Sequence, residues 1–398
     1  MRLLFLTPRS PRPPLKGDQV VAYHRLRLLA RRHEVALLTF YEDEREREEL
    51  RGLEGLCEVR AVQLSRRRAV ARMALGGATS RVPFQVLYYR SAAYRRALAE
   101  LLAERPFDLA DVVLLRLAPY GRLLGDLPRV LDLIDSMQLS FSRRVALERP
   151  PARWAFAEEL RRVTAWERRV AGEFDHLLVV AGRDRELIPA ENVTVVPNGI
   201  DTDAFAPRPE LRRPETVVFS GNMRFPPNVS AAVWFAERCL PLLRARRPEA
   251  RFVVAGAEPA GAVRALGRLD GVEVTGFVES MPAALNAASV AVAPMRSASG
   301  IQNKLLEAMA CGLPCVTTRM GLGDVAAREG EELLVADEPE PFAEAVASLL
   351  ADGERAGRIG TAGRGFVERR HSWEAAAAAV EAVYERVLAA RNAAIRSS

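Results

Sequence analysis

Short apolar runs alternate with amphipathic helical patterns along almost the whole chain, and this alternation constrains the fold more than any other feature. Such a series is typical of parallel α/β architecture. The strands that we expect cover residues 2–6, 34–40, 57–63, 108–114, 129–134, 174–180 and 192–196 in the first half, and 215–220, 251–255, 272–275, 289–293, 314–318 and 332–335 in the second. The helices that we expect include 18–32, 84–104, 152–172, 228–246, 279–287, 300–310, 340–352 and 355–369. The pattern predicts an α/β protein.

The alternation stops and starts again near the middle of the chain. A Pro-Asn-Gly turn at 197–199 is followed by a polar stretch with several prolines, and a new strand pattern begins near residue 215. A chain of 398 residues is too long for one ordinary core and suits two domains of about 150–200 residues each. We predict two Rossmann-like β/α/β domains, 1–196 and 197–371, that face each other across a cleft. A Ser-Trp pair opens a last helix, 372–398, which we expect to pack back across the domain boundary and to end in disordered residues.

Composition narrows the class of protein. No stretch of 18 or more uncharged apolar residues occurs, so the sequence predicts no membrane-spanning helix. The first apolar run is short and is followed at once by Arg9 and Arg12, which favours a buried strand over a secretory signal. We therefore expect a cytoplasmic protein. The four scattered cysteines favour small core residues over a disulfide framework or a zinc site, and no metal is expected.

The net charge of +6 is distributed unevenly. Residues 1–175 carry 32 basic and 23 acidic side chains, or +9, whereas residues 176–398 carry 25 and 28, or −3. A basic half suits an anionic lipid surface, a phosphate-bearing acceptor or nucleic acid, and it is equally compatible with solvated helix faces. We expect no nucleic acid partner, and at most a peripheral contact with an anionic membrane at its inner face. Of the 57 basic residues only Lys16 and Lys304 are lysines, and both lie in glycine-containing turns.

The segment from Pro294 to Pro314 carries the strongest functional pattern. A buried strand ends there in a Ser/Gly turn that opens a helix, and the amide groups at such a helix start can bind an anion. At helical spacing, Gly300, Asn303, Lys304 and Glu307 share one face, while apolar residues share the other. An ammonium there suits a phosphate and the carboxylate suits ribose hydroxyls. An ordinary amphipathic helix with an exposed Lys/Glu pair would show the same pattern.

This segment resembles the donor-binding helix of the retaining GT-B glycosyltransferases of family 4, also described as glycosyl transferases group 1. The resemblance extends through the Ala-Met-Ala-x-Gly-x-Pro pattern at 308–314. The Gly-Ile-x-Asn-Lys pattern at 300–304 is similar to that of bacterial exopolysaccharide-type members, including those associated with PEP-CTERM systems. It implies that Glu307 binds the nucleotide ribose and that Lys304 holds the donor diphosphate. The sequence departs from the family at Ser299, which stands where a first glutamate is usual. The donor-binding residues implied in this segment are Arg296, Ser299, Gly300, Ile301, Gln302, Asn303, Lys304 and Glu307.

A second segment, Val217–Asn228, resembles the first strand and loop of the same family's C-terminal domain. Asn222 and Pro227 stand where the family has an arginine and a lysine that neutralise the diphosphate. We expect Arg224 and Arg296 to take over that role, because they are the nearest cations in the sequence. The resemblance also implies that Gly276, Phe277 and Val278 contact the base through the backbone.

The N-terminal half contributes Lys16, Asp18 and Asp135, which we expect on the acceptor side, and Gly17, which we expect to bind the donor. Lys16, Gly17 and Asp18 follow the first strand, and the resemblance implies a loop that closes on donor and acceptor; an ordinary turn with Asp18 as a helix cap explains them equally well. Asp135 follows another strand, at the end where α/β proteins bind ligands. The resemblance implies that it approaches the acceptor hydroxyl, and the alternative is a helix cap.

The resemblance implies retaining transfer of a sugar from a nucleotide diphosphate to a glycan, lipid-linked or small-molecule acceptor, without metal and without a cofactor. Catalysis would involve Asp135, Lys304 and Glu307, in cell-surface polysaccharide or glycoconjugate biosynthesis. Two alternatives stay open at this point: a nucleotide-sugar isomerase on the same fold, and a degenerate module that binds nucleotide without turnover. The Asp-Thr-Asp sequence at 201–203 is rejected as a metal site because it lies in the linker between the predicted domains.

Overall fold

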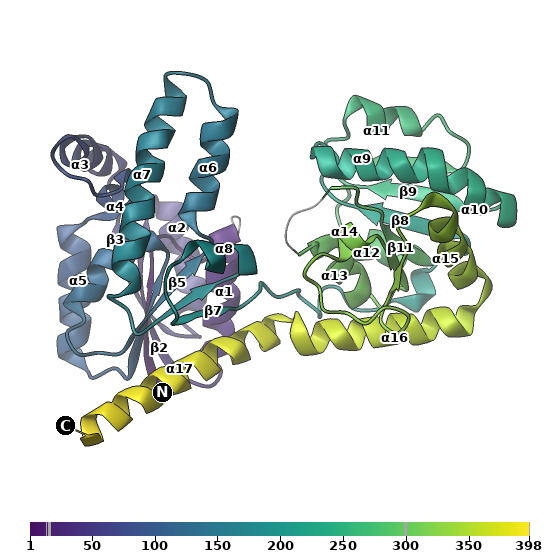
Figure 1. Cartoon of the computed structure of the whole chain (residues 1–398). Coiled ribbons are helices and arrows are strands. Elements are labelled where there is room, and N and C mark those ends of the chain that lie inside the picture. Colours follow the sequence, from purple (N-terminus) through teal and green to yellow (C-terminus); the bar gives the residue numbers. More distant parts are fainter. Residues whose placement is uncertain (13, 15–16, 298–300, 398) are drawn as a thin grey trace. The chain divides into compact units, whose positions relative to one another are not determined.

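The computed structural model describes residues 1–12, 14, 17–297 and 301–397. The chain divides into two compact units: unit 1 comprises residues 1–198 and 376–398, and unit 2 comprises residues 199–375. Each unit is built around one parallel β-sheet with helices packed against it (Figure 1). The sequence prediction of an α/β fold is confirmed. The last helix contributes residues to both units, because it begins in unit 2 and its residues from 376 onward belong to unit 1.

The sheet of unit 1 has seven strands in the order β3-β2-β1-β4-β5-β6-β7. All the strand pairs are parallel, and the order reverses between β1 and β4. The strands are β1 (Arg2–Thr7), β2 (Glu34–Tyr41), β3 (Glu58–Gln63), β4 (Leu109–Val113), β5 (Arg129–Ile134), β6 (His176–Val179) and β7 (Val193–Val195). The helices are α1 (Gly17–Leu29), α2 (Glu44–Leu50), α3 (Arg66–Thr79), α4 (Phe84–Tyr89), α5 (Ala92–Glu104), α6 (Met137–Leu147), α7 (Ala152–Ala171), α8 (Gly182–Leu187) and α17 (Trp373–Ser397), with 3-10 turns η1 (Arg51–Leu53) and η2 (Leu115–Leu123).

Unit 2 repeats this architecture with six strands in the order β10-β9-β8-β11-β12-β13. These pairs are also parallel, and the order reverses between β8 and β11. The strands are β8 (Thr216–Ser220), β9 (Arg251–Ala255), β10 (Val272–Gly276), β11 (Val290–Ala293), β12 (Cys315–Thr317) and β13 (Leu334–Val335). The helices are α9 (Pro226–Trp234), a π-helical turn η4 (Phe235–Cys239), α10 (Leu240–Arg246), α11 (Gly261–Leu266), α12 (Met281–Asn286), α13 (Asn303–Ala310), α14 (Arg319–Leu322), α15 (Pro339–Ala351) and α16 (Gly353–Arg370); a short 3-10 turn, η3 (Pro209–Leu211), precedes β8.

Two of the expected helices differ from those in the structure. The helix expected over 84–104 is split into α4 and α5, because Arg90 and Ser91 are extended and the Ser91 hydroxyl caps α5 by accepting from the Tyr94 amide. The helix expected over 300–310 begins at Asn303, so Ile301 and Gln302 precede it. Helices α3 and α6 lie in gaps between the expected strands, where the sequence predicts helices without giving their bounds.

Buried strands account for the near-continuous apolar runs of the sequence. A parallel sheet covered by helices on both faces exposes neither face to water, so both sets of alternate side chains are apolar. Strand β1 shows this: Leu3, Leu4, Phe5 and Leu6 are all buried. The four cysteines are buried and unpaired, in agreement with the sequence prediction. None of the helices in the described residues is long and apolar enough to cross a membrane.

A buried polar network crosses the middle of the unit 1 sheet. Arg25 of α1 forms an ion pair with Asp132 of β5, and both side chains are 1% exposed. Beside them, the hydroxyl of Tyr384 in α17 donates a hydrogen bond to Asp111 of β4. Burial raises the pKa of Asp111 to about 6, and the Tyr384 hydrogen bond and the Arg25 charge act in the opposite direction. The network therefore attaches α1 and α17 to two neighbouring strands by charged and hydrogen-bonding groups.

The raised pKa of Asp111 makes stability depend on pH. A carboxyl whose pKa rises from 3.8 to about 6 on folding stabilises the protein fully at low pH, and this contribution is lost as the pH increases from about 4 to about 6. We expect Asp111→Asn to remove a pH-dependent change on the order of 3 kcal/mol in the free energy of unfolding over that range. Urea unfolding followed by circular dichroism at several pH values would measure it. The exposed Glu100→Gln variant is the control, and an unchanged pH profile in Asp111→Asn would contradict the assignment.

Candidate functional site

The candidate site is a pocket of about 620 Å³ in unit 2, at the carboxyl ends of β8 and β11. Sheets of this kind bind ligands at that edge, where the strand order reverses. Three segments line the pocket. They are the loop after β8 with the start of α9 (Gly221, Asn222, Phe225, Pro227, Asn228), the stretch after β11 (Met295, Ser297) and the start of α13 (Ile301, Gln302, Asn303, Lys304, Glu307).

Two glycines allow the backbone to approach closely beside this pocket. A Cβ on Gly256, after β9, would lie 1.7 Å from the Gly221 carbonyl oxygen. A Cβ on Gly221 would lie 2.7 Å from the Asn228 amide nitrogen and 3.4 Å from Lys304 Cε. The backbone oxygen beside Gly256 cannot make room for a Cβ, and both glycines have a φ of 153°, which L side chains rarely adopt, so both positions favour glycine. The loop after β8 therefore lies directly against the neighbouring strand end and the lysine side chain.

Helix α13 presents an apolar face to the core and a charged face to the pocket. Leu305, Leu306, Ala308 and Met309 are buried, whereas Lys304 and Glu307 line the pocket. The Lys304 ammonium donates a hydrogen bond of 2.9 Å to the Gln302 side-chain oxygen. Burial lowers the pKa of Lys304, and Glu307 raises it; burial raises the pKa of Glu307, and Lys304 lowers it. The two charges thus stabilise each other in a partly desolvated pocket.

This arrangement can bind an anion and a pair of hydroxyl groups. The first amides of α13 have no partner within the helix and carry a partial positive charge, and Lys304 adds a full charge beside them. Glu307, one turn further along, accepts hydrogen bonds. The sequence prediction that these groups share one helix face is therefore matched by their shared pocket, while Ser299 and Gly300 lie outside the described residues.

Neither arginine that we expected to neutralise a diphosphate lines the pocket. The Arg296 guanidinium lies 5.1 Å from the centre of the Trp234 ring and donates to the Asp337 carbonyl oxygen at 2.9 Å. Arg224 is exposed and pairs with Glu258 at 3.6 Å. A guanidinium beside an indole ring is stabilised by a cation–π interaction. Arg296 makes this contact and does not line the pocket. The predicted roles of both side chains therefore find no support in the geometry.

The other predicted donor residues lie at the end of β10. Gly276 has a φ of 68° and its carbonyl oxygen accepts from the Gly256 amide at 3.0 Å. Phe277 is 75% exposed. Neither these two residues nor Val278 is among the residues that line the pocket. Since β9 separates β10 from β8, these residues lie at the same sheet edge as the pocket but two strands from β8.

In unit 1, Asp135 lies exposed in a tight turn after β5. Ile134 has a φ of 60°, an unfavourable value for a β-branched residue, and its amide donates to Asp132 at 3.1 Å. The Ser136 amide donates to Asp184 at 3.0 Å. Buried carboxylates thus hold the backbone on both sides of Asp135.

Glu167 of α7 contacts this turn, and we did not predict it from the sequence. It accepts hydrogen bonds from the Met137 amide at 2.8 Å and from the Ser136 hydroxyl at 3.0 Å. Burial raises its pKa, and these donors lower it. A glutamate beside Trp166 on the apolar face of an amphipathic helix was the pattern that could have revealed it, because a buried carboxylate requires partners.

The acceptor-side residues at the N-terminus lie at the start of α1. Gly17 is the first residue of this helix, and Asp18 in its first turn binds Arg9 through contacts of 3.1 and 3.2 Å. Lys16 lies outside the described residues. The pair between Asp18 and Arg9 was not predicted from the sequence.

A known protein family matches the part of unit 2 that contains the pocket. The family model for glycosyl transferases group 1 matches residues 214–352, which include every residue that lines this pocket. Residues 214–352 are a glycosyl transferases group 1 domain. The family predicted from the sequence is therefore confirmed.

Two curated relatives of this chain are named as sugar transferases. A GDP-mannose-dependent alpha-(1-6)-phosphatidylinositol monomannoside mannosyltransferase of Mycolicibacterium smegmatis is 30% identical over 211 residues, which is 46% of this chain and 54% of that protein. A D-inositol 3-phosphate glycosyltransferase of Acidothermus cellulolyticus is 31% identical over 269 residues, 57% of this chain and 58% of that protein. The chain thus spans only a little more than half the length of these relatives.

Solved structures share the fold over almost the whole chain. The Anabaena Alr3699/HepE structure in complex with UDP has a TM-score of 0.60 and 14% identity, and the match covers 97% of this chain and all 100% of that one. Sucrose-phosphate synthase from Thermosynechococcus elongatus has a TM-score of 0.59 and 16% identity, with coverage of 98% and 100%. The glycosyl transferases group 1 domain is therefore part of a GT-B fold, as predicted.

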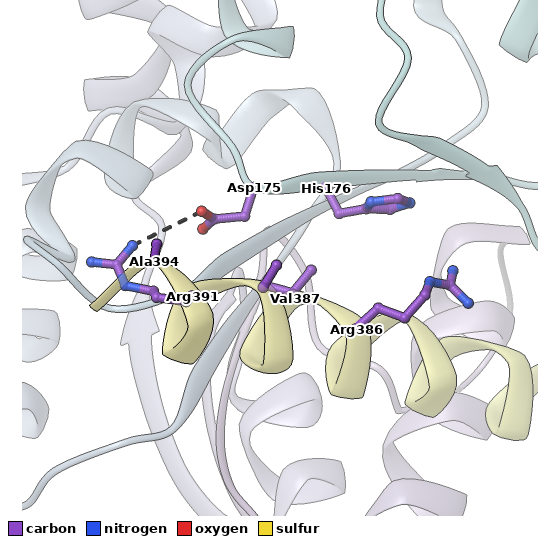
Figure 2. Close-up of a pocket in the computed structure, with 7 residues that line it drawn as sticks. Asp175, His176, Arg386, Val387, Arg391 and Ala394 are labelled. Atoms are coloured by element: carbon purple, nitrogen blue, oxygen red, sulfur yellow. Dashed lines mark ion pairs between the residues drawn. The ribbon is translucent and has the colours of Figure 1, made fainter. Parts of the chain in front are cut away.

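A second cavity, of about 630 Å³, lies in unit 1, outside the glycosyl transferases group 1 domain (Figure 2). Its lining comes from α17 and from the residues at the start of β6. Asp175 and Arg391 form an ion pair of 3.9 Å across it, and His176 forms a hydrogen bond of 2.8 Å with Thr194. Burial, followed by the charge of Arg386, lowers the pKa of His176. This cavity lies at the amino ends of the strands, so we do not take it as the site.

The hydrogen bonds that Glu167 accepts allow a test of how far this side chain stabilises the turn that contains Asp135. Glu167→Gln replaces one acceptor oxygen by an amino group that faces donors, and we expect a loss of about 1–3 kcal/mol in the free energy of unfolding. Urea unfolding at pH 7 would measure it. Glu186→Gln, at an exposed position of α8, is the matched control. Equal stability of the two variants would show that the turn does not depend on Glu167.

Proposed function

We propose that this chain is a glycosyltransferase that moves a sugar from a nucleotide diphosphate sugar to a hydroxyl group of an acceptor. The observation that carries the proposal is the presence of Lys304, Glu307 and the start of α13 in one pocket of a glycosyl transferases group 1 domain. Lys304 and the helix amides would bind the diphosphate, and Glu307 would accept hydrogen bonds from the ribose. The name of the GDP-mannose-dependent relative, and the UDP bound in a structure of the same fold, support a nucleotide donor.

We further propose that transfer proceeds with retention and without a metal ion. The acceptor oxygen forms a bond to the anomeric carbon from the face that the diphosphate leaves, and the electron pair of the breaking bond passes to the leaving phosphate oxygen. That oxygen takes the proton of the acceptor hydroxyl. Lys304 and the amides of α13 are fixed charges where negative charge develops on the leaving group, so they stabilise the transition state without reorganisation.

Asp135 is proposed as the acceptor-side carboxylate. Its exposed position at the carboxyl end of β5 is where α/β proteins contact ligands, and buried groups hold its turn. A carboxylate there would accept a hydrogen bond from the acceptor hydroxyl. Asp18, at the start of α1, is proposed on the same side of the reaction, and Gly17 is proposed to contact the donor.

The acceptor is proposed to be a glycan, a lipid-linked sugar or a small polar molecule, in the synthesis of cell-surface polysaccharide or glycoconjugate on the cytoplasmic side. Helix α3 supports a peripheral contact with anionic lipid, because Arg66, Arg67 and Arg68 are exposed on it together with Leu75, which is 73% exposed. The M. smegmatis relative, named for a phosphatidylinositol monomannoside, is consistent with an acceptor at a membrane.

The donor assignment predicts a specific loss of diphosphate binding. We expect Lys304→Ala to weaken binding of a nucleoside diphosphate about tenfold to a hundredfold while leaving binding of the nucleoside nearly unchanged, because only the phosphates contact the ammonium. Calorimetric titration with UDP, GDP and dTDP, each beside its nucleoside, would measure this and name the base. Arg268→Ala, at an exposed position of unit 2, controls for loss of charge. Equal affinity of the Lys304→Ala variant and the unmodified protein would refute the donor site.

Asp135 generates a separate prediction on turnover. If its carboxylate contacts the acceptor, Asp135→Asn lowers kcat about a hundredfold or more and leaves the melting temperature nearly unchanged, since the side chain is exposed. Release of nucleotide from the identified donor, in the presence of acceptor, measures the rate. A variant with a lowered melting temperature and normal kcat in its folded fraction would identify Asp135 as a helix cap.

A further inference from the structure

Two arginines of unit 1 lie just after two neighbouring strands, at the point where the strand order of the sheet reverses. Arg9 follows β1, and Arg116 lies at the start of η2, directly after β4. The two strands are neighbours in register, with Leu6 opposite Val112, so both loops begin at the same edge of the sheet. An open α/β sheet forms its natural crevice at such a switch point. The position is therefore one where a ligand of unit 1 would bind.

Both arginines contact the same tyrosine. Arg9 Nε lies 3.4 Å from the hydroxyl of Tyr89, the last residue of α4. The Arg116 guanidinium carbon lies 5.8 Å from the centre of the Tyr89 ring, and Arg116 Nε donates to the Gln85 side-chain oxygen at 2.7 Å. Helix α4 thus holds two cationic side chains beside each other, and one face of the Arg116 guanidinium is covered by an aromatic ring.

The charges of this cluster are only partly balanced. Asp18 pairs with Arg9 at 3.1 Å, and the more distant Glu42, which also acts on Arg9, is exposed to solvent. Arg116 has no such carboxylate in contact, and its Nη1 is buried without a hydrogen-bond partner in the described residues. Burial, and then the neighbouring charge of Arg9, lower the pKa of Arg116, whereas Tyr89 and the charge of Asp18 raise it. A buried, charged donor without an acceptor is costly, and most such groups in folded proteins have a partner.

We propose that Arg9 and Arg116 bind an oxyanion carried by the acceptor substrate, a phosphate or a carboxylate. The assignment rests on the proposed function only in naming the ligand as the acceptor. An oxyanion would supply the acceptor atoms that Arg116 Nη1 lacks, and the planar fork of a guanidinium suits both phosphate and carboxylate. The start of α1, which follows Arg9 in the chain, adds helix amides of the favourable sign nearby. The ion pair with Asp18 keeps Arg9 in place.

The experiment separates this site from the donor pocket, which also binds phosphate. The full chain carrying Lys304→Ala is titrated by calorimetry with methyl phosphate, inorganic phosphate and acetate at constant ionic strength. In this background we expect an oxyanion to bind at one site, and we expect Arg116→Gln and Arg9→Gln each to weaken that binding about tenfold to a hundredfold. Tighter binding of methyl phosphate than of acetate would identify a phosphate-bearing acceptor, and the reverse order a carboxylate-bearing one.

Two further variants make the result decisive. Arg96→Gln, at an exposed position of α5, removes the same charge elsewhere in unit 1 and should leave binding unchanged. Arg116→Lys keeps the charge without the fork and should bind less tightly than the unmodified arginine. If Arg116→Gln has an altered circular dichroism spectrum, Arg9→Gln and Arg116→Lys decide the question. Absence of oxyanion binding, or binding unaffected by substitution of either arginine, overturns the proposal.

Failure of this proposal differs from failure of the glycosyltransferase proposal. Nucleoside diphosphate binding to the protein with native Lys304 reports on the donor site alone. If UDP, GDP and dTDP all fail to bind while Arg116-dependent phosphate binding persists, the site stands as an anion site and the glycosyltransferase assignment falls. If a nucleotide binds and the oxyanion does not, the reverse holds.

Discussion

The parallel pairing of strands is the constraint on which the rest of this structure depends. Because all the strand pairs in both sheets are parallel, the carboxyl ends of all strands in a unit lie at one edge, and the loops that follow them are brought together. In unit 2 the loops after β8 and β11 form the pocket that contains Lys304. In unit 1 the loops after β1 and β4 carry Arg9 and Arg116. The amino ends hold ion pairs such as Asp175–Arg391, which connect secondary structures.

The charged face of α13 shows how the protein keeps a lysine and a glutamate charged in a partly desolvated pocket. Burial alone favours neutral forms of both Lys304 and Glu307, and each charge offsets part of that effect on the other. The apolar face of the helix is packed in the core, so the lysine stem lies against Gly221. The positive charge is therefore oriented before any ligand binds, which is the condition under which fixed charges stabilise a transition state most effectively.

Unit 1 is held together by a different kind of interaction. The buried pair Arg25–Asp132 and the neighbouring Tyr384–Asp111 hydrogen bond link α1, β4, β5 and α17. Removing one partner of such a pair leaves a buried charge and typically costs about 3–5 kcal/mol, although replacement of the whole pair by apolar residues need not. Asp132 also accepts from the Ile134 amide. The same network that fixes α17 therefore supports the turn that carries Asp135.

The sequence by itself determined the fold class, the position of most strands, and the charged face of α13, because these follow from apolar periodicity and helical spacing within a short stretch of chain. Tertiary structure alone decided where the cations lie relative to the pocket and to one another. Arg296 was expected in the donor pocket from its sequence position, and it stacks on Trp234 instead. Arg116 gave no local pattern that marked it, and the position of Glu167 on an apolar helix face did not name its partners, since the partners of both residues lie about 30 residues away in the chain. A side chain's role in a site depends on contacts between distant segments, and spacing within one segment does not contain that information.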